Sequence, residues 1–168
     1  MSMSMIGEIE LKKTLEVIKQ FLDVSQLVQE VKNPESVRST YNNVVSSEIK
    51  YRGIDVTADD CLKDTFKTTL SIISRGGLYK DDYPYLITGI RKIQNHIFGF
   101  SVNGEVTYKF AAPVLLFVAK MINKVYEVQI TPQAPFTEKN YRAINQISKL
   151  DQRAFDMIAT AIRMVDLH

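Results

Sequence analysis

Apolar residues recur with a helical period along most of this chain. Near the N-terminus, Leu11, Leu15, Ile18 and Leu22 keep the i, i+4, i+7, i+11 spacing of a single helix face. Comparable stripes predict further helices, so that the expected helical segments are 9–31, which a break near Asp23–Ser25 could divide, 34–45, 58–75, 84–96 and 114–125, with two more after residues 137 and 151. The pattern therefore predicts a mainly α domain, built like a bundle of about six helices.

Capping residues mark where several of these helices begin. Asn33 precedes Pro34, and an asparagine cap followed by proline at the first helical position is a typical helix start. Thr57 and Asp60 have the spacing of a capping box, and Asp151 is placed to cap the last helix. Residues 48–56 lose the helical period, so we expect a loop there that could hold a short strand.

The stretch from Ile97 to Tyr126 is the unit around which we expect the other helices to pack. Its first half contains Asn103-Gly104 between two runs of alternating apolar residues, which predicts a β-hairpin. A two-residue loop would put the apolar side chains of the two strands on opposite faces. A three-residue loop would instead place Phe100 opposite Val106 on one face, and we favour that register because it leaves one face buried and one hydrated.

The second half of this unit predicts the most apolar helix of the chain. We expect it to begin at Pro113, because a missing N–H is no loss in the first turn of a helix. Between Val114 and Val125 only two lysines and an asparagine interrupt the apolar surface, as is typical of the core helix of a bundle. The apolar run 110–119 is half of the roughly 20 residues that a membrane span needs, so we expect no membrane association.

Length and composition indicate an ordinary globular protein. The 168 residues are 45% hydrophobic and 24% charged, which favours a single domain over 1–168, with residues 1–5 expected to be disordered. Cys61 is the only cysteine, so no intramolecular disulfide can form. The N-terminus shows no apolar signal segment, and both observations predict a cytoplasmic location.

The sequence offers little for catalysis. The two histidines, His96 and His168, are far apart, and no nucleotide-binding, hydrolase or zinc-protease motif is present. Glu35 followed by Glu48 and Lys50 loosely resembles the metal site of restriction-endonuclease-like nucleases, which would imply a Mg²⁺-dependent nuclease as a remote alternative. Glu35 is equally well placed to oppose a helix dipole. We therefore expect no enzyme activity, no cofactor and no metal.

The distribution of charge is the strongest pointer to a function. The net charge is only +2, yet residues 83–124 carry five basic side chains and one acidic one, an excess that favours an anionic partner. Solvated lysines on a helical surface would explain the same excess. Arg91, Lys92 and Asn95 share one stripe of the helix after Pro84, and helices 58–75 and 84–96 followed by the hairpin have the order of a winged-helix DNA-binding domain.

We therefore expect a non-catalytic small subunit of a larger assembly, most simply a nucleoprotein. It would contact the nucleic-acid backbone without sequence specificity and dock protein neighbours or a second copy. The residues expected at the nucleic acid are Arg91, Lys92, Asn95, Lys109, Lys120 and Lys124. The alternatives are a protein-binding adaptor or inhibitor and a winged-helix regulator.

Overall fold

A computed structural model describes residues 27–28, 30–81, 83–94 and 105–166 of the chain. Their regular elements are, in chain order, α2 (Pro34–Arg52), α3 (Ala58–Ile73), α4 (Tyr83–Gln94), α5 (Glu105–Asn123), the 3-10 helix η1 (Lys139–Gln146), α6 (Ile147–Leu150) and α7 (Gln152–Asp166). The prediction of a mainly α fold is confirmed. No helix in these ranges is both long and apolar enough to cross a membrane.

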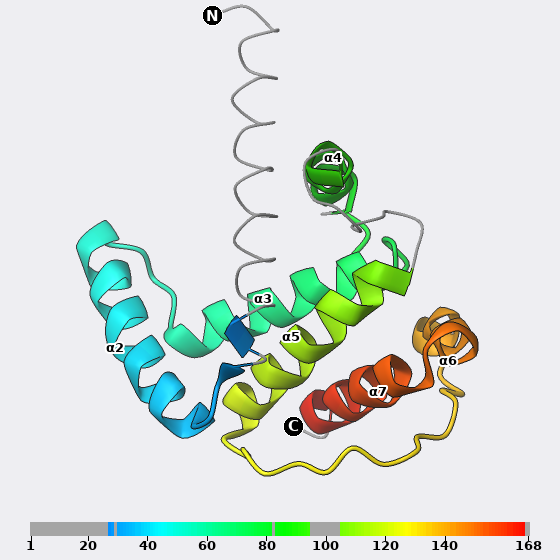
Figure 1. The fold of residues 1–168 in the computed structure, drawn as a ribbon. Coiled ribbons are helices and arrows are strands. Elements are labelled where there is room, and N and C mark those ends of the chain that lie inside the picture. The colour runs from blue at the N-terminus through cyan, green and yellow to red at the C-terminus, as the bar shows by residue number, and fades with distance from the viewer. Residues whose placement is uncertain (1–26, 29, 82, 95–104, 167–168) are drawn as a thin grey trace, which may run out of the picture.

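Helix α5 is the centre of the bundle, as the apolar stretch predicted. Figure 1 shows it lying between α3 and α7, and its contacts with these two helices are the most extensive in the described chain. Ala111, Leu115 and Ala119 are fully buried along its length. Their i, i+4, i+8 spacing, with alanines at both ends, lets the neighbouring helices approach α5 closely.

Two further helices extend this central layer at opposite ends. Helix α2 packs against α5 and α3 near the C-terminal end of α5, whereas α4 packs against α3 (Figure 1). The segment 124–138, which contains no helix or strand, then connects α5 to η1. Asn145 fixes this return, because its side chain accepts from the N–H of Phe136 at 2.7 Å and donates to the same residue's carbonyl at 2.9 Å.

The predicted helix starts are confirmed in detail. The Asn33 side chain accepts from the N–H of Ser36 at 3.1 Å, and Asp151 accepts from the N–H of Ala154 at 3.0 Å. Thr57 and Asp60 form the reciprocal capping box of α3, with bonds of 2.9 and 3.1 Å. Local capping chemistry therefore positions α2, α3 and α7.

The predicted β-hairpin is wrong in the part that the structure describes. Residues 105–108, expected to form its second strand, are the first turn of α5, and no strand occurs in the described ranges. The first strand and the Asn103-Gly104 turn lie outside those ranges. Tyr108, Ala111 and Leu115 share the buried side of α5, so residues that alternate as in a strand also continue a helical stripe.

The predicted start of the central helix is also wrong, because α5 already begins in the residues that were assigned to the hairpin. Pro113 lies inside α5 rather than at its beginning. Its ring removes one backbone donor, so the carbonyl of Lys109 loses its helical partner. Pro113 is half-buried and Lys109 is exposed. The packing of the surrounding α5 side chains against α3 and α7 outweighs the cost of the proline.

Two further boundaries differ from the prediction. Helix α2 continues through residues 48–52, where a loop was expected, and ends at Gly53 with a φ of 64°. This left-handed cap lets the Gly53 N–H bond back to the carbonyls of the last turn, and glycine adopts it at no steric cost. The segment predicted as a helix after Thr137 begins as the 3-10 helix η1, whose N-cap Glu138 makes no side-chain capping bond.

Candidate docking groove

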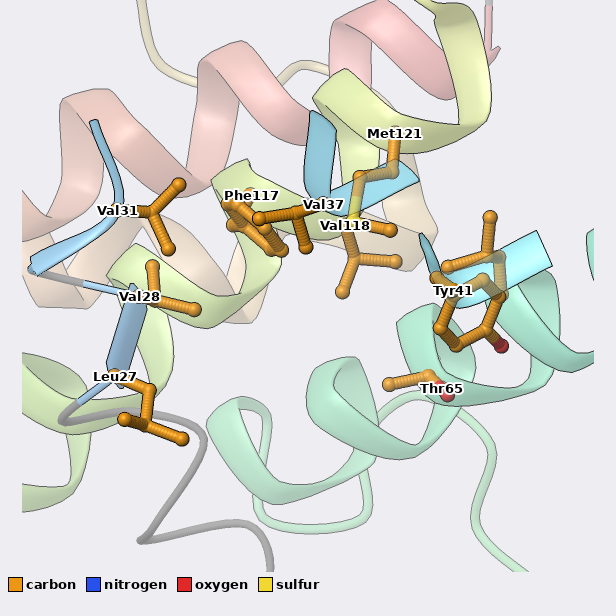
Figure 2. A pocket seen from close by; sticks show the side chains of 10 residues that line it. Leu27, Val28, Val31, Val37, Tyr41, Thr65, Phe117, Val118 and Met121 are labelled. Carbon is orange, nitrogen blue, oxygen red and sulfur yellow. The ribbon is translucent and has the colours of Figure 1, made fainter. Parts of the chain in front are cut away.

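An apolar groove of about 340 Å³ opens where α2, α3 and α5 meet Leu27, Val28 and Val31. Figure 2 shows Val28 and Val31 on one side of it, Tyr41 and Thr65 on the other, and Phe117 between them. The complete lining is Leu27, Val28, Val31, Val37, Tyr41, Leu62, Thr65, Phe117, Val118 and Met121. No charged side chain lines the groove.

The groove has a buried floor and an accessible rim. Leu62, Val118 and Met121 form the floor, with 3%, 4% and 2% of their surface exposed. Leu27 lies on the rim and is 61% exposed. The hydroxyl of Thr65 donates to the carbonyl of Cys61 at 2.9 Å, so its hydrogen-bonding capacity is used within α3. The groove can therefore offer shape and apolar surface rather than polar orientation.

Two more open depressions continue the groove. One shares Val28, Val31 and Phe117 with it and extends towards Lys120. The other shares Val37 and Tyr41 and extends along α2 towards Val44, which is 57% exposed. Together with the groove, these depressions form a band that crosses α5 and extends along α2. Exposed apolar bands of this kind are typical of interaction surfaces.

A buried arginine holds α2 as one wall of the groove. The Arg38 side chain is 6% exposed, and its guanidinium bonds the Asp59 carboxylate at the start of α3 and the Met121 carbonyl near the end of α5. Its Nε also donates to Asn42 Oδ1 at 3.0 Å. One side chain thus joins three helices. This role could not be predicted from the sequence, since a single arginine on a helix is ordinary.

Burial also changes the pKa of Tyr41, the tyrosine that lines the groove. The Tyr41 hydroxyl is partly removed from water, and this desolvation raises its pKa, with Cys61 and Asp59 adding to the shift and Arg38 opposing it. The phenol therefore stays neutral through the physiological range. A neutral Tyr41 keeps this end of the groove free of charge.

The residues expected at nucleic acid are brought together only in part. Lys109 and Lys120 lie on the same side of α5, about 20° apart around the axis and ~16 Å apart along it. Lys124 is exposed just after the helix, with a φ of 56°. Arg91 is exposed on α4, a different helix. The side chain of Lys92 and the whole of Asn95 lie outside the described part.

One basic neighbour of Arg91 was missed from the sequence. Burial raises the pKa of the Tyr83 hydroxyl, while Arg75 and Arg91 both act to lower it, so both cations lie near this phenol. Arg75 follows α3 with a φ of 52°. Arg75 and Arg91 lie on different elements, so only the tertiary structure brings both charges to act on Tyr83.

The resemblance to a nuclease metal site is not supported by the geometry. Glu35 lies in the first turn of α2, and Glu48 and Lys50 lie near the end of the same helix. Thirteen residues of helix separate the two carboxylates by ~20 Å, too far for one metal ion. Glu48 pairs instead with Arg52 at 3.4 Å. No group of three or more potential metal ligands gathers within the described ranges.

Comparisons with models of protein families, with curated proteins and with solved structures found no significant match to this chain. The function must therefore be argued from the groove and the charges themselves.

Proposed function

We propose that the chain is a non-catalytic docking subunit that binds an amphipathic helix of a protein partner. The observation that carries this proposal is the uncharged apolar groove between α2, α3 and α5, with its continuation along α2. Tyr51 and Ile54, at the far end of α2, are 89% and 50% exposed and enlarge the apolar surface. A cytoplasmic location belongs to the same proposal.

The chemistry of the groove favours a helix over a small polar ligand. Small-molecule sites combine apolar walls with a few polar groups that orient the ligand. Here the lining is aliphatic and aromatic, and the Thr65 hydroxyl is bonded within its own helix. Grooves of this composition suit the apolar stripe of a helix, which needs burial and shape but no hydrogen bonds.

A second candidate function is non-specific contact with a nucleic-acid backbone. The observation that favours it is the alignment of Lys109 and Lys120 on one side of α5, with Lys124 beyond. Lys120 lines the depression that adjoins the groove. A basic edge beside an apolar groove would let one surface serve both a protein neighbour and a phosphate backbone, as in the subunit of a nucleoprotein assembly.

The docking proposal can be tested with a photo-cross-linking residue at Thr65, introduced into the full chain in the cells it comes from. We expect one discrete protein adduct from Thr65 and none from Arg153, an exposed position on α7. Val44→Asp should abolish the adduct, because it places a charge on the apolar band. Asn43→Asp introduces the same charge at the neighbouring exposed residue of α2 and should leave the adduct in place.

The result that would contradict the docking function is equally specific. If Thr65 and Arg153 give the same products, or if Val44→Asp and Asn43→Asp behave alike, the apolar band does not select a partner. Nucleic-acid contact would then be the remaining candidate.

A further inference from the structure

The described chain begins at the groove itself. Leu27 and Val28, the first residues described, already line it, and Val31 follows on the same side. Twenty-six residues precede Leu27 in the sequence. Whatever conformation these residues adopt, their last member is covalently attached to the rim of an apolar groove.

The preceding sequence carries a complementary surface. The spacing of Leu11, Leu15, Ile18 and Leu22 would place them in one aliphatic stripe of a helix, about 16 Å long from first to last. On such a helix the opposite side would carry Lys13 and Gln20, which suit water, with Ile9 beside them. An aliphatic stripe needs an apolar cover, and the open groove needs an apolar occupant.

The connection has a suitable length. Residues 23–26, Asp-Val-Ser-Gln, separate the stripe from Leu27. Four residues span at most about 13 Å, so this tether keeps the stripe near the groove. Asp23 and Ser25 are residue types that cap helix starts, so a reversal here has the local chemistry it requires.

We propose that the segment 9–22 docks its aliphatic stripe into the groove of its own chain and covers it until a partner helix displaces it. The displacement rests on the proposed docking function, whereas the intramolecular contact does not. A short tether raises the local concentration of the segment to the millimolar range, so modest apolar contact is enough to hold it in place. A second copy could offer the same stripe only at the concentration of the protein.

Disulfide cross-linking in the full chain tests the contact. In a Cys61→Ser background, cysteines are placed at Ile18 on the stripe and at Thr65 on the groove rim, and dilute protein is oxidised with diamide. We expect a cross-link within one chain, formed at least tenfold faster than in a control with Gln20→Cys and Thr65→Cys. Gln20 is two residues from Ile18 but on the opposite face of the predicted helix.

Three outcomes would overturn the inference. Equal rates for the Ile18 and Gln20 pairs would mean that the stripe does not face the groove, and no cross-link in either would mean that the segment does not reach it. Cross-links that join two chains, at a rate that rises with protein concentration, would assign the groove to a second copy.

Hydrogen exchange gives a test that needs no engineered cysteine. Leu15→Asp with Ile18→Asp should speed exchange in the groove residues 37–45 by several-fold, while Lys13→Asp with Gln20→Asp should not. Unchanged hydrogen exchange of residues 37–45 in the first variant would contradict the proposal. Both experiments use the protein without a partner, so they test the intramolecular contact alone. If they show no contact while Thr65 still captures a partner in cells, only this inference fails. If they show the contact while Thr65 captures no partner, only the docking function fails.

Discussion

Replacing Arg38 by methionine should destabilise the fold strongly, although it keeps most of the side-chain stem. The guanidinium joins three helices through the Asp59 carboxylate, the Met121 carbonyl and the Asn42 side chain. Methionine preserves the packing of the aliphatic part and removes every one of these bonds. The change therefore isolates the polar connection between α2 and the body of the bundle.

The expected loss follows from the surroundings of each bond. A hydrogen bond that involves a charged group contributes about 1.5–3 kcal/mol, and the Arg38 side chain is only 6% exposed. The Asp59 side chain is 60% exposed, so water can replace its lost partner and the ion pair counts for little. The bond to the Met121 carbonyl is buried and has no such substitute. We expect a total of about 2–4 kcal/mol.

Urea unfolding followed by far-ultraviolet circular dichroism measures this loss, since the chain has no tryptophan for fluorescence. The matched control is Arg52→Met, which breaks the exposed pair with Glu48 on the same helix and should change stability by no more than about 0.5 kcal/mol. A loss below about 1 kcal/mol for Arg38→Met, with an unchanged m-value, would refute the idea that this side chain fixes α2.

Four other variants should have measurable effects. Leu115→Ala should cost about 2–5 kcal/mol and Val118→Ala somewhat less, because both side chains are buried in α5; unchanged melting temperatures would contradict a core role. Bonds with Thr57 lower the pKa of Asp60 below its ordinary 3.8. The stability that this carboxylate adds should therefore be present above pH 3.8 and disappear as the pH falls through the lowered pKa. A stability difference between wild type and Asp60→Asn that is independent of pH would exclude this. Lys109→Ala with Lys120→Ala should reduce the salt dependence of nucleic-acid binding by about two units of slope in a titration at several salt concentrations, and no binding at low salt would remove that function.

The sequence predicted best what local chemistry decides. The Asn33 cap and the box at Thr57 depend on residues three positions apart, so they form wherever the helix forms. The central helix was also predictable, because a segment apolar on most of its surface must be buried. The hairpin failed because Tyr108 and its neighbours fit both a two-residue and a helical period, and the packing of α5 between α3 and α7 decided between them.

The groove could not be predicted, because no single segment contains it. Val37, Leu62 and Phe117 belong to three helices, and each read from the sequence as an ordinary member of an apolar stripe. The arginine that fixes their relative positions was invisible for the same reason: Arg38 and Met121 are 83 residues apart. The sequence already placed Arg91 and Lys109 on different elements, but the hairpin prediction hid the fact that Lys109 and Lys120 belong to one helix.

Variants on the floor of the groove and on its exposed extension along α2 can separate partner docking from stability. Val118 belongs to the floor and is also a core residue, so its loss weakens the fold and the groove together. Val44 lies on the exposed extension of the same band and contributes little to the core. A charge at Val44 should therefore abolish partner binding in a protein that melts at an unchanged temperature. If binding and stability instead fell together, the band along α2 would be part of the folding core rather than a surface kept for a partner.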